Sequence, residues 1–155
     1  MSTSRIVANQ SKLTRAIALA NMRIRLYVRE APHESPFGTT TELAKALSSG
    51  FVNKDGLPIP ARPFMKQFFA ENKNEITQHL VDSGVWKMKG PQAKSALDAN
   101  AQWLLSAFRM WLVTGGVTPP NALDTIIRKK NNIPLYEHGT LLAAIDVEAK
   151  IASVK

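Results

Sequence analysis

The chain contains no cysteine. Disulfide bonds, thiolate zinc sites and thiol redox chemistry are therefore excluded. Long apolar runs are missing as well: no stretch approaches the roughly 20 apolar residues that cross a bilayer, and the most apolar stretch, Trp103 to Val113, is interrupted by Arg109. The first residues show no charged region, apolar block and cleavage site in succession. We therefore expect no signal peptide, and a soluble protein made inside the cell.

Motifs for catalysis and metal binding are also missing. The sequence has no nucleophile elbow, no phosphate-binding glycine loop and no pair of carboxylates at acid–base spacing. The pair His33-Glu34 lacks the second histidine of a zinc-binding helix, and Pro32 and Pro36 flank it with non-helical chain. We interpret His79 and His138 as surface or packing residues. The sequence therefore predicts no enzyme, no catalytic residue, no metal site and no cofactor.

Positive charge is what the chain has in excess. Its 155 residues include 20 Lys and Arg against 12 Asp and Glu, which gives a net charge of +8 and a pI near 10.0. Such a balance favours contact with nucleic acid or with an acidic protein surface. No zinc finger, ribonucleoprotein motif or helix-turn-helix is present, and the aromatic residues recur at the helical spacing typical of a core. The basic residues are thus candidates for contacts to the phosphate backbone of DNA, without recognition of its sequence, or to an acidic protein partner.

Two long amphipathic helices are predicted over residues 63–83 and 92–114, where apolar side chains recur every three or four positions. Shorter helices are expected over residues 9–21, from the Thr39–Thr41 hydroxyls to about Ser49, and after Asn121, whose side chain suits an N-cap. The two long helices follow each other directly in sequence. They are therefore expected to pack as a pair.

Two strands are predicted near residues 22–29 and 141–151, where apolar and charged residues alternate. The charged positions are Arg23, Arg25 and Arg29 on the first strand, and Asp146 and Glu148 on the second. Because opposite charges on neighbouring strands stabilise a sheet, the two strands are expected to pair with each other. The predicted fold class is α+β, with a small antiparallel sheet packed against two long helices in a single domain covering residues 1–155.

Residues 53–63 are predicted to form a proline-rich extended arm. Pro58, Pro60 and Pro63 each fix their own φ and keep the preceding residue out of the helical region. Pro63 also suits the first turn of the long helix that follows. A helix start does not require three prolines, so the arm is the strongest candidate for a functional element.

Three motifs occur in order along the chain. The first is Ile59-Pro60-Ala61-Arg62-Pro63-Phe64-Met65, which leads into a long helix. The second is Pro119-Pro120, followed by Thr125-Ile126 and Arg128-Lys129, and the third is Pro134-Leu135 followed by Gly139-Thr140-Leu141 before the last strand. Together they resemble the tail-completion, neck or virion-morphogenesis proteins of tailed bacteriophages, and the resemblance covers residues 22–150.

The resemblance implies a structural virion protein that forms a homo-oligomeric ring at the head–tail junction and joins the tail to the head. Its partners would be further copies of itself, virion proteins on the connector or portal side and on the tail side, and packaged DNA in non-specific contact. It would involve no membrane, and the protein would be made in the host cytoplasm and then reside in the virion. The implied protein-interface residues are Ile59, Pro60, Arg62, Pro63, Phe64, Pro119 and Pro120. Candidate contacts to acidic partners or to the DNA backbone are Arg128, Lys129 and Lys130.

We expect the arm from Gly56 to Phe64 to be anchored by Phe64 and to contact an adjacent subunit or the connector ring, with Arg62 pairing with an acidic group there. A pre-organised arm loses less conformational entropy on docking. An alternative function is a sequence-independent DNA-binding protein, whose basic residues contact phosphates. Tight, length-dependent DNA binding by the isolated monomer would distinguish this alternative.

Overall fold

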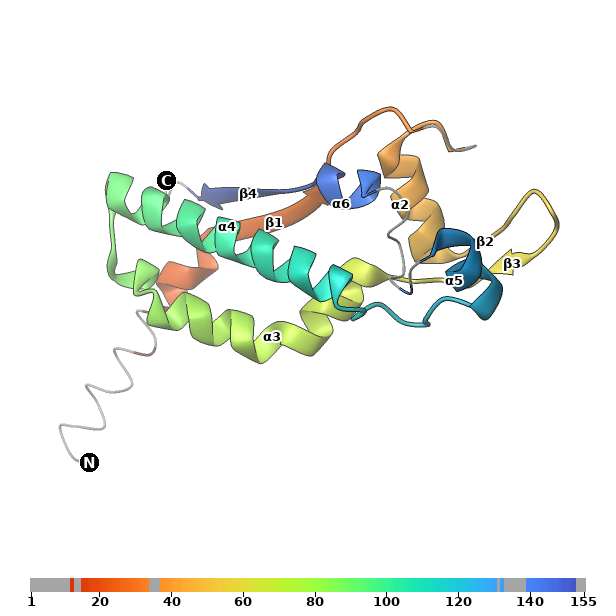
Figure 1. Cartoon of the computed structure of the whole chain (residues 1–155). Helices are drawn as coiled ribbons and strands as arrows, with labels where there is room; N and C mark the ends of the chain where they lie inside the picture. The colour runs from red at the N-terminus through yellow and green to blue at the C-terminus, as the bar shows by residue number, and fades with distance from the viewer. Residues whose placement is uncertain (1–11, 13–14, 34–36, 131, 133–138, 153–155) are drawn as a thin grey trace. The chain divides into compact units, whose positions relative to one another are not determined.

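The computed structural model describes residues 12, 15–33, 37–130, 132 and 139–152. Its elements are, in chain order, β1 (Met22–Val28), α2 (Thr40–Ser49), β2 (Phe51–Val52), β3 (Pro58–Ile59), α3 (Phe64–Asp82), the 3-10 turn Val85–Lys87, α4 (Gly90–Val113), α5 (Leu123–Lys129), α6 (Thr140–Ala144) and β4 (Ile145–Ile151) (Figure 1). The predicted α+β class is confirmed, with two long helices and a small antiparallel sheet.

The predicted pairing of the first and last strands is also confirmed, because β1 and β4 form one two-stranded sheet. Backbone hydrogen bonds at the two ends of this sheet fix its direction. The N–H of Ala152 donates to Asn21 O at 2.7 Å, and the N–H of Arg29 donates to Ala144 O at 2.7 Å. The strands are therefore antiparallel.

Opposite charges meet across this sheet as expected. Arg25 lies 3.5 Å from Glu148, and Arg29 lies 3.9 Å from Asp146. Glu148 is also 3.0 Å from Lys150. The hydrogen bond from Lys150, followed by the Coulomb attraction of Lys150 and Arg25, holds the pKa of the Glu148 carboxyl below its ordinary value. Part of the positive charge of the chain is thus compensated within the sheet.

The last strand is shorter than predicted, because residues 140–144 form the short helix α6 and β4 begins only at Ile145. Leu141 and Ala144 are both buried and lie three residues apart, which suits one face of a helical turn. Gly139, at φ 72°, precedes the helix. A run of four small or aliphatic residues is compatible with either period, and the charged alternation typical of a strand starts only at Asp146.

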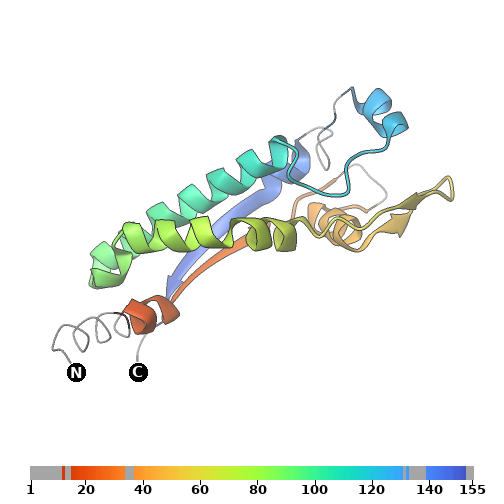
Figure 2. The ribbon, with the colours of Figure 1, turned by 90° about the horizontal axis from the view of Figure 1, so that it is seen from below.

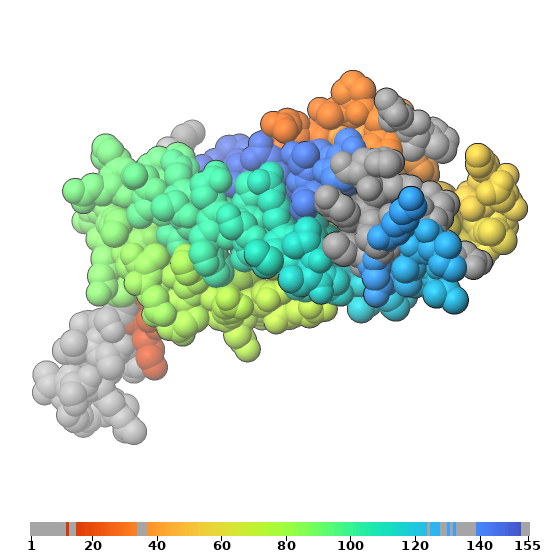
Figure 3. Space-filling model, in the orientation of Figure 1, coloured from red at the N-terminus to blue at the C-terminus, as the bar shows by residue number. Residues whose placement is uncertain are grey.

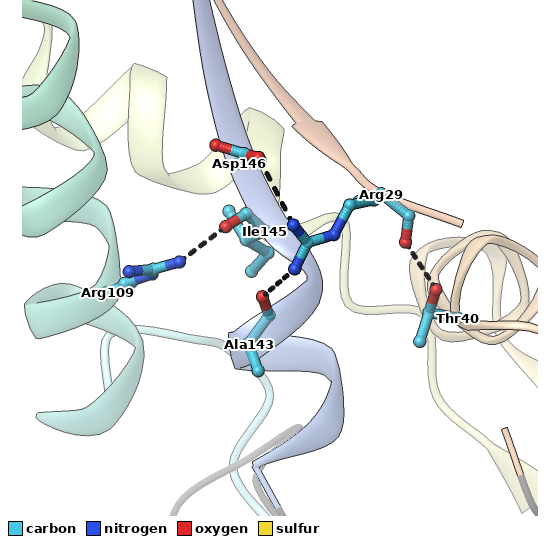
Figure 4. Close-up of polar contacts among 6 residues, drawn as sticks. All are labelled: Arg29, Thr40, Arg109, Ala143, Ile145 and Asp146. Carbon is cyan, nitrogen blue, oxygen red and sulfur yellow. Dashed lines mark hydrogen bonds and ion pairs between the residues drawn. The ribbon is translucent and has the colours of Figure 1, made fainter. Parts of the chain in front are cut away.

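The junction between α6 and β4 accepts polar contacts from Arg29, the residue after β1, and from Arg109 on α4 (Figure 4). The guanidinium of Arg29 donates to Ala143 O at 3.4 Å, and the guanidinium of Arg109, on α4, donates to Ile145 O at 2.8 Å. The hydroxyl of Thr40, at the start of α2, donates to Arg29 O at 2.6 Å. The C-terminal end of β1 is therefore bound by the start of α2, and the N-terminal end of β4 is bound by α4.

The long helices agree with their predicted bounds within two residues. In both Figure 1 and Figure 2, α3 and α4 lie side by side. At the start of α2, Thr39 accepts a hydrogen bond from Glu42 N–H at 3.2 Å, as an N-cap does. The capping role predicted for Asn121 is wrong, because Ala122 occupies the N-cap of α5 without a side-chain bond. Among the described residues, the buried Nδ2 of Asn121 has no hydrogen-bond partner.

The chain divides into two compact units, each with its own packing. The first comprises residues up to Arg25, Asn74–Trp103 and the chain from Val147 onward, and the second comprises Leu26–Lys73 and Leu104–Asp146. In the first unit, the rings of His79 and Trp103 stack with centroids 3.6 Å apart. The prediction of a single domain stays a prediction.

The second unit has an aromatic core formed by α3 and α4. Phe64, Phe68 and Phe108 are almost completely buried, and the rings of Phe68 and Phe108 meet edge to face with centroids 4.9 Å apart. Trp111 adds a second edge contact to Phe68 at 5.6 Å. The interpretation as core is therefore confirmed for Phe64, Phe68 and Phe108, whereas it is wrong for Phe69, which is 40% exposed. This core supports the elements that carry the first two motifs.

Candidate functional site

The arm predicted over residues 53–63 is a small hairpin rather than a single extended strand. Strand β2 pairs with β3 in antiparallel register, with Phe51 opposite Ile59 and Val52 opposite Pro58. Side-chain oxygen Oδ1 of Asn53 accepts hydrogen bonds from the N–H groups of Asp55 at 3.0 Å and Leu57 at 2.8 Å. The tip is therefore ordered by its own residues, as expected for an Asx turn.

Gly50 fixes the base of this hairpin. Its φ of 75° is in the left-handed region, and a Cβ at this position would lie 2.8 Å from Ala61 N and 2.9 Å from Ile59 O. Only glycine allows the end of α2 to approach the backbone beyond β3 so closely. The N–H of Arg62 also donates to Leu47 O at 2.8 Å. The C-terminal end of the arm is therefore bound to α2.

The main finding at this site is that the first two motifs contact each other. The side chain of Arg62 donates from Nε to Pro119 O at 2.8 Å and from Nη2 to Pro120 O at 3.1 Å. The amide of Gln67 donates to Thr118 O at 2.6 Å and accepts from Thr118 N–H at 3.1 Å. Two side chains thus hold three successive carbonyls of the loop after α4. We call these five residues the proline clamp.

Arg62 is only 7% exposed, which is unusual for an arginine. Burial lowers the pKa of its guanidinium, which nevertheless remains protonated at neutral pH because an arginine loses its proton only far above neutrality. Its side chain is engaged with the loop of its own chain. The hypothesis that Arg62 pairs with an acidic group of a neighbouring subunit therefore stays a prediction, and the contact observed is an internal one.

The other predicted interface residues of the arm differ in how deeply they are buried. Phe64 is buried against Phe108, with ring centroids 6.3 Å apart, so it anchors the arm to the core of its own chain. Pro63 and Ile59 are half-buried, whereas Pro60 is exposed. Phe64 begins α3, and the carbonyl of Pro63 accepts from Gln67 N–H at 2.9 Å. The arm therefore joins α3 without a flexible linker.

The loop after α4 passes over an aromatic ring to reach the clamp. A Cβ on Gly116 would overlap the indole of Trp111, and the Gly116 N–H donates to Trp111 O at 3.0 Å. The same indole donates from Nε1 to Glu71 on α3 at 2.8 Å. Val117, the next residue, is 1% exposed. Position 116 thus has no room for a side chain, because the Trp111 indole occupies that space. The loop is packed against this indole at Gly116 and is buried at Val117.

Helix α5 follows the clamp directly. Pro119 and Pro120 have exposed surfaces, and α5 begins three residues after Pro120. The predicted basic residues Arg128 and Lys129 lie in the last turn of α5, and Lys130 is its exposed C-cap in the left-handed conformation, at φ 55°. The structure thus places the basic cluster at the end of α5. The residues of the third motif at 134–138 lie outside the described residues.

Sequence reasoning missed Gln67 as a member of the clamp. A glutamine in the first turns of an amphipathic helix resembles any exposed polar residue, and its partner Thr118 lies far along the chain. The only signal was its place one turn after Pro63 and two residues after the end of the first motif, which contains Arg62. The exposure of Leu123 and Ile127 on α5 was missed too, because their helical spacing reads equally well as a core face.

Among the described residues, no group of three His, Asp or Glu side chains is placed to hold a metal ion. None of the helices in the described part of the chain combines the length and apolar content that a membrane crossing requires. Comparison with protein-family models, curated proteins and solved structures finds no match to this chain. The candidate site is therefore defined by its own geometry: a preformed arm, the proline clamp and helix α5.

Proposed function

We propose that this chain is a structural virion protein of a tailed bacteriophage, which forms a homo-oligomeric ring at the head–tail junction and joins the tail to the head. The observation that carries the proposal is the proline clamp. Arg62 of the first motif binds the carbonyls of Pro119 and Pro120 in the second motif. Gln67, two residues after the first motif, binds the carbonyl of Thr118, directly before the second. Two motifs that carry the family resemblance thus form one unit of structure.

The properties of the arm support an assembly role. It is a hairpin closed by its own hydrogen bonds, and its base is fixed by Gly50 and by the clamp. An element that is ordered before it binds loses little conformational entropy on docking. A ring subunit needs a protruding surface of one kind and a receptor of another, because its contacts are heterologous. An arm on a rigid base suits the first of these requirements.

The basic residues support contact with acidic neighbours. Residues 128–130 bring three positive charges to the end of α5. Salt weakens both protein and DNA contacts of this kind. Tight binding would slow DNA that slides through a channel. We therefore assign acidic virion proteins, and not DNA, as the binding partners of these basic residues. A sequence-independent DNA-binding protein remains the second candidate, and the net charge of +8 favours it.

Localisation in purified particles tests the proposal. Virions of a phage that carries this reading frame, with an epitope tag at the C-terminus of the chain, are labelled with gold-conjugated antibody and imaged. Gold at the head–tail junction, with a constant number of copies per particle by mass spectrometry, is the expected result. Absence of the protein from infectious particles would reject the virion role. Filter binding of the untagged monomer to DNA of several lengths then tests the second candidate.

A further inference from the structure

Two basic side chains lie against one tryptophan in the connection between α3 and α4, and a third follows it closely. Trp86 is in the 3-10 turn, and its ring centroid is 4.9 Å from Lys87 Nζ and 5.8 Å from Arg15 Cζ. Both distances are within the range of cation–π attraction. Lys89, two residues after the turn, is exposed, and all four residues belong to the first unit. We call Arg15, Trp86, Lys87 and Lys89 the tryptophan cluster.

The position of Trp86 is fixed by its own turn. Its indole Nε1 donates to Val81 O at 3.2 Å, and the neighbouring side chain of Val85 is completely buried. In Figure 3, the red residues near the N-terminus lie against the green connection between the long helices. The ring therefore brings together positive charges from two segments that are about 70 residues apart in the sequence.

Carboxylates do not neutralise these charges within the described part of the chain. None of the three cations of the tryptophan cluster forms an ion pair with an Asp or Glu there. The carboxylate nearest in sequence, that of Asp82, accepts a hydrogen bond from Gln78 Nε2 at 2.7 Å. Lys94, by contrast, is paired with Asp98. Because like charges on one site repel each other, an anion bound among them is stabilised.

The surface of the tryptophan cluster favours a phosphate backbone over an acidic protein as the anion. The core of a protein–protein interface is poor in lysine and contains aromatic side chains as apolar anchors. Here the indole is half-buried and already in contact with two cations, and the one large apolar side chain exposed in residues 83–89 is Met88, at 37%. Interfaces with DNA, in contrast, are polar and strongly positive.

We propose that the tryptophan cluster contacts the phosphate backbone of double-stranded DNA. This inference rests on the proposed function, because packaged DNA is the polyanion that a subunit at the head–tail junction meets. Contacts to phosphates are independent of sequence, and dissociation constants for such binding are about 10⁻⁴–10⁻⁶ M at physiological salt, so DNA can still slide. The site differs from the one that sequence reasoning assigned to DNA-backbone contacts, which is Arg128, Lys129 and Lys130.

The salt dependence of DNA binding tests this contact. Binding of the full chain to a fluorescently labelled DNA duplex is measured by anisotropy at salt concentrations from about 50 to 200 mM. Each phosphate contact contributes about 0.9 to the slope of log K against log salt concentration. Arg15→Gln, Lys87→Gln and Lys89→Gln should therefore each reduce the slope by about 0.9, and the triple variant by about 2.7. The matched control, Lys94→Gln, removes the same charge from an ion pair in the same unit and should leave the slope unchanged.

A slope in the triple variant equal to that of the control would overturn the proposed contact, once circular dichroism shows that both variants are folded. No binding of the unmodified chain to the duplex would overturn it too. If the chain then binds poly-glutamate, and the triple variant does not, the partner of the tryptophan cluster is an acidic protein instead. If gold labelling still places the protein at the head–tail junction in these cases, only this contact fails and the proposed function stands.

Discussion

Replacing Arg62 with alanine tests the proline clamp most simply, and its cost can be worked out from the structure. The substitution removes two hydrogen bonds, to Pro119 O at 2.8 Å and to Pro120 O at 3.1 Å. A hydrogen bond from a charged donor contributes about 1.5–3 kcal/mol. Both prolines are exposed, so water can reach their carbonyls in the variant, which favours the lower end of that range. We therefore expect a loss of about 3 kcal/mol in the free energy of unfolding.

Urea unfolding of the full chain, followed by circular dichroism, measures this loss as a lower midpoint at an unchanged slope. Arg62→Lys should lose less, about 1–2 kcal/mol, because an ammonium can replace one of the two bonds but not the planar pair. The matched control is Arg23→Ala, which removes an exposed arginine from β1 and should change stability by less than about 0.5 kcal/mol. An Arg62→Ala protein as stable as this control would refute the clamp.

Three further variants probe the packing and the sheet. Gly116→Ala should lower the free energy of unfolding by about 1–3 kcal/mol, because the new methyl group overlaps the Trp111 indole. A Trp111→Leu background should reduce this loss in a double-mutant cycle. Equal losses in both backgrounds would contradict the overlap. Phe68→Ala should lower the free energy of unfolding, measured in urea, by about 3–5 kcal/mol, because the ring packs in the core against Phe108. A loss under about 1 kcal/mol would show that this position is not tightly packed. Glu148 has a lowered pKa in the folded chain, so its stabilisation is present above its unfolded pKa and is lost as the pH falls through its folded pKa. Glu148→Gln should therefore flatten the decline of stability below about pH 5, which thermal unfolding at several pH values checks; an unchanged pH profile would contradict the pairing.

Much of the fold could be predicted because local patterns and packing agree. Alternating charge identified β1 and most of β4, and the opposite signs of Arg25 and Glu148 predicted that these strands pair. The helical spacing of aromatic residues predicted the core on α3 and α4. The start of β4 was placed too early, because the small aliphatic residues of α6 satisfy the periods of both helix and strand.

The candidate site could be predicted only in part. Three prolines in the arm predicted extended chain, and β3 is extended, but the turn that makes it a hairpin depends on the side chain of Asn53. The contact of Arg62 and Gln67 with the loop at 118–120 joins residues more than 50 positions apart. No local pattern encodes such a contact, because it depends on how α3 and α4 pack. The resemblance named both motifs, whereas only the structure brings them together.

Electron microscopy of a lysate whose phage or prophage carries a stop codon early in this reading frame tests the proposed role most directly. The expected result is DNA-filled or leaking heads beside unattached tails, and supplying the intact chain from a plasmid should restore complete particles. Intact, infectious virions in the lysate without the plasmid would contradict the head–tail role, and the DNA-binding alternative would then take its place.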